Sequence, residues 1–381
     1  MATAATHLNF ADTETVAVDD EATAVKFRYF PVLDGLRGLA ILVVMIYHLE
    51  FLVPDVHEFV KGGFLGVDIF FVLSGFLITS ILLKEYEEFG QINLKNFYIR
   101  RLFRLAPAFW VFLLCLYLFG YVLLPRGEAD LIYANDNFAY AFFYLMNWHR
   151  ALGDAVTGNL NHTWSLAIEE QFYILWSLVL FKAFAENKTR KQIALFTGLF
   201  VLVLIAWRAG RALIGMDIDV LYYSTDTRID ALLIGCVAAM IYFWRLVPDK
   251  FFVSMAFNLI AIGSCIIAAF TLLSFEHKDM SLYYGPLSVF SVAVAVMILW
   301  LVNRKHSWLS DLLGFKLLRL VGQISYALYL WHYLFYEFAK KSFSSVPLQI
   351  TVGVGSAFAV SAASYFLVEK PFLRLKGKFS R

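Results

Sequence analysis

The stretch "LDGLRGLAILVVMIYHLE", residues 33–50, predicts a membrane-spanning helix that carries two ionisable side chains. Arg37 is followed by Gly38, then by nine apolar or aromatic residues, and then by His48. A charge within hydrocarbon costs at least a few kcal/mol, so such a residue usually marks a functional site. Eleven residues advance about 20° beyond three helical turns, so Arg37 and His48 share one face, roughly 16 Å apart along the axis. We expect Arg37 near the inner interface and His48 in the outer half of the membrane.

The composition of the whole chain is that of an integral membrane protein. Of its 381 residues, 60% are hydrophobic and 16% are charged, whereas soluble domains usually carry about 25% charged residues. The net charge of +2 gives no indication of nucleic-acid binding. The three cysteines lie in apolar runs and show neither metal-ligand spacing nor a disulfide framework. We therefore expect no metal site and no nucleic-acid partner.

Ten stretches are apolar and long enough to approach the roughly 20 residues that a spanning helix needs. They predict an all-α, polytopic membrane helix bundle of about ten transmembrane helices. The expected spans cover residues 32–53, 63–83, 103–124, 163–184, 191–208, 228–245, 251–274, 283–302, 318–339 and 347–369. The aromatic run 136–148 is shorter and ends in polar residues. It predicts a re-entrant or interfacial segment.

The distribution of lysine and arginine predicts that both termini are cytoplasmic. Basic residues are enriched in cytoplasmic loops of membrane proteins. With the N-terminus inside, the inner segments hold 20 lysine and arginine residues against nine in the outer segments, with Lys26, Arg28 and Arg37 left aside. We expect a disordered cytoplasmic tail over residues 1–30, one membrane domain over 31–372 and a basic cytoplasmic tail over 373–381.

Polar side chains recur in the other expected spans. The second span holds Asp68 and Ser74, and the ninth sets Ser325, Tyr329 and His332 on one helical face. Further groups lie at the ends of the third, fourth and sixth spans: Arg100, Arg101 and Arg104 on an inner loop; Trp164 and Glu169; and Asp226, Arg228 and Asp230. Each group alone has a structural alternative, such as helix packing, membrane anchoring or a mutually neutralising ion network. Their number indicates a pathway or an active site inside the bundle.

The chain resembles the acyltransferase-3 family of membrane proteins, which O-acylate sugars and other hydroxyl-bearing molecules. The resemblance covers nearly all of residues 31–372, and the family's arginine–ten residues–histidine motif is present as Arg37 and His48. Seven stretches carry it in order: "LDGLRGLAILVVMIYH", "GVDIFFVLSGFLIT", "FYIRRLFRLAP", "HTWSLAIEEQFY", "TDTRIDALLIG", "ISYALYLWH" and "VEKPFL". Each is degenerate alone, but their order and spacing are specific.

The resemblance implies an acyl-CoA donor on the cytoplasmic side, most often acetyl-CoA, acting as a co-substrate with no tightly bound cofactor. The acceptor is expected to be a hydroxyl group of a sugar or glycan. Guanidinium groups bind phosphates through bidentate hydrogen bonds. The phosphate groups of the donor are therefore expected to bind Arg100, Arg101 and Arg104, with Arg37 and Ser74 along the path of the donor. The roughly 16 Å between Arg37 and His48 suits the extended pantetheine arm.

His48 is the expected general base, with Arg37 assisting, because an alcohol needs a proton acceptor as it attacks a thioester. A carboxylate would orient the imidazole. Asp68, Glu169 and Asp230 are the candidates, and Glu169 is preferred. The residues expected to face the acceptor are Asp68, Trp164, Asp226, Arg228, Asp230, Tyr329 and His332.

A second class of function uses the same residues. Buried histidine, arginine and carboxylate groups also form proton or substrate pathways in membrane transporters and exporters. The two halves of the chain show no matched broken helices, which transporters built from inverted repeats would have. Retention of both Arg37 and His48 disfavours a non-catalytic scaffold. We therefore favour an O-acyltransferase, which we expect in a bacterial inner membrane and whose acyl chain and acceptor the sequence leaves open.

Overall fold

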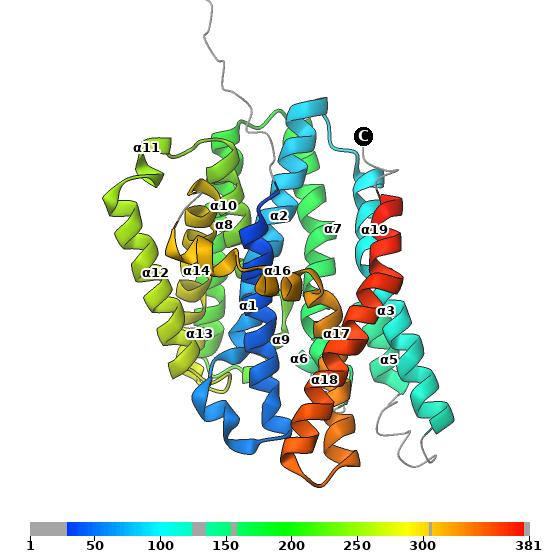
Figure 1. Cartoon of the computed structure of the whole chain (residues 1–381). Helices are drawn as coiled ribbons and strands as arrows, with labels where there is room; N and C mark the ends of the chain where they lie inside the picture. The colour runs from blue at the N-terminus through cyan, green and yellow to red at the C-terminus, as the bar shows by residue number, and fades with distance from the viewer. Residues whose placement is uncertain (1–28, 124–134, 154–157, 305–306, 377–381) are drawn as a thin grey trace, which may run out of the picture.

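The computed structural model describes residues 29–123, 135–153, 158–304 and 307–376, and the regular structure within these ranges is helical throughout (Figure 1). Ten of the described helices have 18 residues or more. They are α1 (Pro31–His48), α2 (Gly66–Phe89), α3 (Leu94–Leu123), α7 (Trp164–Ala185), α8 (Arg190–Leu213), α10 (Thr225–Phe243), α12 (Met255–Ser274), α14 (Pro286–Asn303), α17 (Ser325–Ser342) and α18 (Val346–Ser364). The expected all-α bundle is confirmed.

Shorter helices connect the long ones. They are α5 (Asn135–Phe142), α6 (Met146–Ala151), α9 (Ile218–Tyr223), α11 (Asp249–Phe252), α13 (Met280–Tyr283), α15 (Trp308–Leu313), α16 (Lys316–Gln323) and α19 (Lys370–Lys376). A π-helical turn, Tyr365–Glu369, joins α18 to α19. Short 3-10 turns lie at 49–51, 54–59, 63–65 and 161–163.

Seven described helical segments are long and apolar enough to cross a membrane. They are Pro31–Phe51, Gly63–Phe89, Leu94–Leu118, Arg190–Leu213, Met255–Ser274, Pro286–Asn303 and Val346–Leu375. The remaining long helices, α7, α10 and α17, carry ionisable side chains such as Glu169, Arg228 and His332. The chain is an integral membrane protein, and the count of ten spans stays a prediction.

Glycines allow two pairs of helices to approach backbone to backbone. In α1 and α16, a Cβ atom on Gly322 would lie 1.8 Å from the carbonyl oxygen of Asp34, and one on Gly38 would lie 2.2 Å from that of Leu318. In α2 and α10, a Cβ on Gly75 would lie 1.8 Å from the carbonyl oxygen of Leu232. Small residues at such crossings are typical of packing between membrane helices.

Two expected boundaries differ from the structure. The third expected span began at residue 103, but α3 begins at Leu94, so the three arginines lie on the helix and not on a loop. The ninth expected span, 318–339, is broken at Ile324 into α16 and α17. Figure 1 shows α16 lying across the bundle while α17 runs along it. The aromatic run 136–148 forms the short helices α5 and α6.

The start of α1 and the end of α19 lie at the same end of the bundle (Figure 1). Tyr29 and Leu373 accordingly line one cavity. The cytoplasmic placement of the two termini stays a prediction. Residues 1–28 and 377–381 of the expected tails lie outside the described residues. Helix α1 begins well below the upper end of α2 (Figure 1). Arg37 lies in the second turn of α1 and lines both cavities described below, and its depth in the membrane stays a prediction.

Candidate active site

A cavity of about 400 Å³ lies between α1, α2, α3, α7 and α17. Apolar side chains such as Leu77 and Ile81 form much of its wall. All five helices also contribute polar side chains, namely Asp34, Arg37, Ser74, Arg101, Arg104, Ser165, Glu169, Tyr173, Ser325, Tyr326 and Tyr329. The expected spans one, two, four and nine thus bring part of their polar residues to one place, whereas His48, Asp68 and His332 do not line this cavity.

A second cavity of about 280 Å³ adjoins the first and shares Arg37 and Arg104 with it. It lies toward the end of the bundle that holds Tyr29 and Leu373. The π-helical turn contributes Glu369 to its wall. The two cavities together lead from that end of the bundle past two guanidinium groups to Glu169 and Tyr329.

The arginines of α3 do not act as one cluster. Arg101 and Arg104, three residues apart on the helix, both line the larger cavity. The guanidinium carbon of Arg101 lies 5.3 Å from the ring centroid of Tyr173. Arg100 points elsewhere, because one of its amino groups donates to Oε2 of buried Glu85 at 2.6 Å. The expected three-arginine clamp is therefore reduced to Arg101 and Arg104, joined by Arg37.

Glu169 is held by two hydroxyl groups within the larger cavity. Ser74 donates to its Oε1 atom and Tyr173 to its Oε2 atom, both at 2.9 Å. The positive charges of Arg37 and Arg101 act on the same carboxyl group. Glu169 was expected to orient His48, and its placement among these partners does not support that role.

The side chain bonded to His48 is a second histidine. Nδ1 of His48 lies 2.9 Å from Nε2 of His332, and Nδ1 of His332 lies 2.9 Å from the carbonyl oxygen of Leu328. His332 is fully buried. The structure gives no support to the expectation that a carboxylate orients His48, because Glu169, Asp68 and Asp230 each bond to other side chains.

Tyr329 connects the cavity to this histidine pair. It lines the larger cavity, and its ring centroid lies 5.9 Å from that of His332 on the same face of α17. Its hydroxyl group donates to the carbonyl oxygen of His162 at 2.6 Å and lies 2.7 Å from Oγ of Ser165. His48 is not among the residues that line either cavity. The wall between the cavity and the histidines is therefore built around Tyr329.

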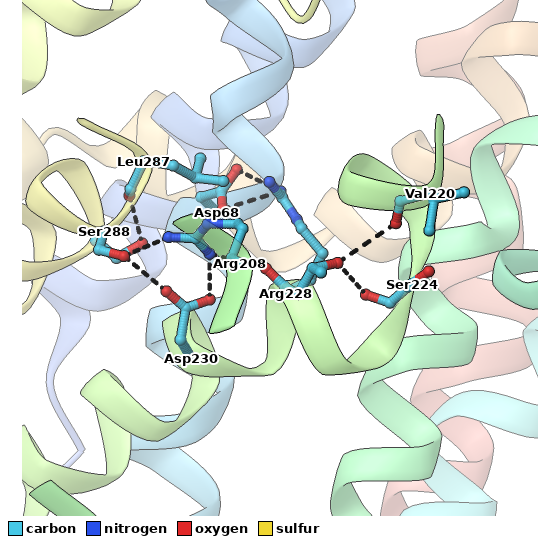
Figure 2. Close-up of polar contacts among 10 residues, drawn as sticks. Asp68, Arg208, Val220, Ser224, Arg228, Asp230, Leu287 and Ser288 are labelled. Carbon is cyan, nitrogen blue, oxygen red and sulfur yellow. Dashed lines mark hydrogen bonds and ion pairs between the residues drawn. The ribbon is translucent and has the colours of Figure 1, made fainter. Parts of the chain in front are cut away.

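Two buried ion pairs join α10 to its neighbours α2 and α8 (Figure 2). One amino group of Arg228 donates to both oxygens of Asp68, at 3.0 and 2.9 Å. Arg208 donates to Oδ1 of Asp230 at 2.8 Å, and Ser288 donates to Oδ2 at 2.8 Å. All four charged side chains are buried. Asp68 and Asp230 thus serve as counter-ions and neither lines a described cavity.

The charges expected to neutralise one another each have a partner from another helix. Asp226 accepts from Arg211 at 2.6 Å and from the indole of Trp207 at 2.8 Å. Trp164 is buried, with its ring centroid 4.8 Å from that of Tyr222 and 5.7 Å from the guanidinium carbon of Arg228. Both Asp226 and Trp164 were expected to face an acceptor; here Asp226 pairs with Arg211, and Trp164 packs against buried Arg228.

Several residues of this arrangement were absent from the expected site, among them Tyr173, Arg208 and Glu85. Tyr173 lies one turn after Glu169, and this i,i+4 spacing could have found it. Arg208 is a charge within an apolar helix, which is itself a signal of a buried partner. Glu85 had no distinguishing sequence signal. No group of three or more histidine, cysteine, aspartate or glutamate side chains in the described part of the chain could hold a metal ion.

Comparison with known proteins identifies related sequences. Residues 30–366 match the family model of an acyltransferase domain, acyltransferase family 3. The "Peptidoglycan O-acetyltransferase OatA" of Listeria monocytogenes is 35% identical over 370 residues, which cover 92% of this chain and 56% of the relative. A Staphylococcus aureus protein named "Putative O-acetyltransferase" is 34% identical over 360 residues, covering 91% of this chain and 58% of the relative.

A Bacillus subtilis protein named "Putative peptidoglycan O-acetyltransferase YrhL" is 35% identical over 378 residues, covering 93% of this chain and 56% of the relative. The chain thus spans little more than half the length of the curated relatives it matches. No solved structure matches it.

Proposed function

Since this chain belongs to the acyltransferase family whose domain model matches residues 30–366, we propose that it is a membrane O-acetyltransferase. It moves an acetyl group from acetyl-CoA on the cytoplasmic side to a hydroxyl group of a glycan. The similarity to peptidoglycan O-acetyltransferases makes a peptidoglycan sugar the first acceptor to test. The observation that carries the proposal is the basic cavity that ends at Tyr329, beside the His332–His48 pair.

The donor enters at the end of the bundle where both described ends of the chain lie. Its phosphate groups bind Arg101 and Arg104, because guanidinium groups form charge-assisted, often bidentate hydrogen bonds with phosphate oxygens. Arg37 lines both cavities and so meets the donor between its nucleotide and its thioester. The apolar wall around Leu77 and Ile81 accommodates the pantetheine arm.

The transfer itself requires a base for the acceptor hydroxyl. His48 accepts the hydroxyl proton as the oxygen attacks the thioester carbonyl carbon. The new C–O bond forms, the C–S bond breaks, and the leaving thiolate takes the proton back from His48. The products are an O-acetyl ester and free CoA. The Tyr329 side chain forms the wall of the cavity on the side of His48. It must move aside for the thioester to reach His48.

Mass spectrometry of cell-wall glycan fragments tests the reaction. Cells that carry the gene should yield fragments heavier by one acetyl group than cells that lack it, and purified protein should transfer labelled acetyl from acetyl-CoA. An exporter using the same buried residues would move glycan across the membrane without consuming acetyl-CoA. Absence of label transfer to peptidoglycan, teichoic acid and lipid-linked glycan acceptors alike would overturn the proposed function.

A further inference from the structure

The pairing of His48 with His332 fixes where their protons lie. A backbone carbonyl oxygen can only accept a hydrogen bond, so the contact between Nδ1 of His332 and Leu328 requires a proton on that nitrogen. In a neutral imidazole the other nitrogen then carries a lone pair. Nε2 of His332 is therefore the acceptor toward His48.

The same reasoning applies one step further along the chain of hydrogen bonds. Because Nε2 of His332 accepts, Nδ1 of His48 must donate across the 2.9 Å contact. The remaining nitrogen of His48, Nε2, then carries the lone pair. We propose that His332 is a positioning residue, which holds His48 in the Nδ1-protonated tautomer and so presents Nε2 as the base. This inference rests on the proposed function.

The surroundings of the pair restrict how else His48 could turn. Its ring stacks at 6.0 Å on Phe51, lies 5.6 Å edge-on to Tyr333, and lies 5.5 Å edge-on to Tyr47. These aromatic rings hold the plane of the imidazole, while His332 determines which nitrogen carries its proton. The arrangement corresponds to the base and orienting group of a catalytic triad, with a neutral imidazole in the place of the carboxylate.

His332 also has a role after proton transfer. When Nε2 of His48 has taken the hydroxyl proton, the imidazolium can donate more strongly through Nδ1 to His332. His332 passes the polarisation on to the carbonyl oxygen of Leu328, because hydrogen bonds in a chain strengthen one another. The proton stays on the two rings until the leaving thiolate removes it, so the step needs no further acid.

Two substitutions separate this role from a packing role. His332→Gln can keep a carbonyl acceptor near the position of Nε2, whereas His332→Phe keeps a ring and loses the acceptor. We expect His332→Gln to stay within about tenfold of the wild-type kcat and His332→Phe to lose a factor of about 100 to 10,000, as when an orienting group is removed. The KM for acetyl-CoA should change in neither variant, because His332 does not line the donor cavities.

Trp331→Phe is the matched control on the same turn of α17. Trp331 is buried, and its indole nitrogen has no hydrogen-bond partner among the described residues. The Trp331→Phe variant should keep the wild-type kcat and lose a little melting temperature. If His332→Phe melts early and its folded fraction turns over at the wild-type rate, His332 is a packing residue and the inference is overturned.

A spectroscopic measurement tests the tautomer whether or not the enzyme turns over. In protein labelled with ¹⁵N-histidine, the signal that disappears in His48→Ala belongs to His48, one of eight histidines. We expect it to report a protonated Nδ1 and an unprotonated Nε2, and to lose this preference in His332→Phe. A protonated Nε2 in the wild type would overturn the inference. If the protein shows this spectrum but transfers no acetyl group, the tautomer inferred for His48 stands and the proposed function is rejected.

Discussion

One amino group of Arg228 donates to both carboxylate oxygens of Asp68, and both side chains are buried between α2 and α10. Three aromatic rings surround the guanidinium group, with its carbon 4.9 Å from the centroid of Tyr222, 5.7 Å from that of Trp164 and 5.9 Å from that of Phe71. The charge of Arg228 is therefore balanced by Asp68, and the faces of the rings add cation–π attraction. Its role in the described structure is to join α10 to α2.

Asp68→Asn should destabilise the protein because it leaves Arg228 without a counter-ion. Breaking a buried ion pair on one side typically costs about 3–5 kcal/mol. We expect a lower melting temperature in detergent and a normal affinity for acetyl-CoA in the protein that remains folded. If Asp68→Asn melts like the wild type but no longer binds acceptor, Asp68 is a substrate-binding residue, as the sequence predicts.

The double variant Asp68→Leu/Arg228→Met provides the control. Apolar residues of similar volume often replace a buried ion pair at little cost or with a gain in stability. The double variant should therefore melt closer to the wild type than Asp68→Asn does. Equal losses in both proteins would mean that the pair is not the source of the destabilisation.

The arginines of α3 should differ in their effect on the donor. Arg101→Ala and Arg104→Ala should each weaken acetyl-CoA binding by about 1.5–3 kcal/mol, the usual range for a hydrogen bond to a charged group. Arg100→Ala should leave donor affinity unchanged and lower stability, because it removes the ion pair with Glu85. Isothermal titration with acetyl-CoA measures the donor affinity of each variant, and thermal unfolding measures its stability. Equal losses of affinity in all three variants would restore the three-arginine clamp expected from the sequence.

The close crossing of α1 and α16 should be sensitive to one added methyl group. A Cβ on Gly322 would lie 1.8 Å from the carbonyl oxygen of Asp34, which is a helix-backbone atom and cannot turn aside as a side chain could. Gly322→Ala must push the helices apart, at a typical overpacking cost of about 1–3 kcal/mol. The shift moves α1 near Arg37, so we expect weaker acetyl-CoA binding together with a lower melting temperature.

Gly198→Ala in α8 is the matched control, since nothing lies within 4 Å of its added Cβ. Alanine favours a helix by up to about 1 kcal/mol over glycine, so this variant should melt at or above the wild-type temperature. Gly322→Ala protein with wild-type melting and donor affinity would show that the two helices adjust to the methyl group without consequence.

The sequence predicted which residues lie inside the bundle better than it predicted their partners. Hydropathy identifies the long helices because a span needs about 20 apolar residues whatever it packs against. The helical period likewise placed Ser325, Tyr329 and His332 on one face, and all three are buried. Each of these inferences concerns a single helix, so residue spacing along one segment is enough to make it.

Partner choice depends on how helices distant in sequence are arranged. Glu169 and His48 were expected to meet because Glu169 lies in one motif with Trp164 and at a depth comparable to that of His48. In the structure Glu169 faces Ser74 and Tyr173, while His48 faces a residue 284 positions away. The break at Ile324 turns α16 across the bundle and leaves α17 beside α1. Nothing in the local sequence pattern specifies that change of direction.

The last prediction concerns the two residues of the first helix. His48→Ala should reduce turnover by a factor of about 100 to 10,000, the usual contribution of a general base. Its affinity for acetyl-CoA should persist, because the described donor cavities do not include His48. Arg37→Lys should instead raise the KM for acetyl-CoA, because lysine keeps the charge but loses the planar pair of donors.

Ile46→Ala, on the same turn as His48 but exposed on the surface of the bundle, is the control for a local effect on α1. It should leave the rate and the KM unchanged. The measurement is initial-rate transfer of labelled acetyl, with melting temperature recorded for each variant. His48→Ala protein that melts and turns over like the wild type would exclude His48 as the base. Loss of donor binding in that variant would instead place His48 on the path of the thioester and not at its end.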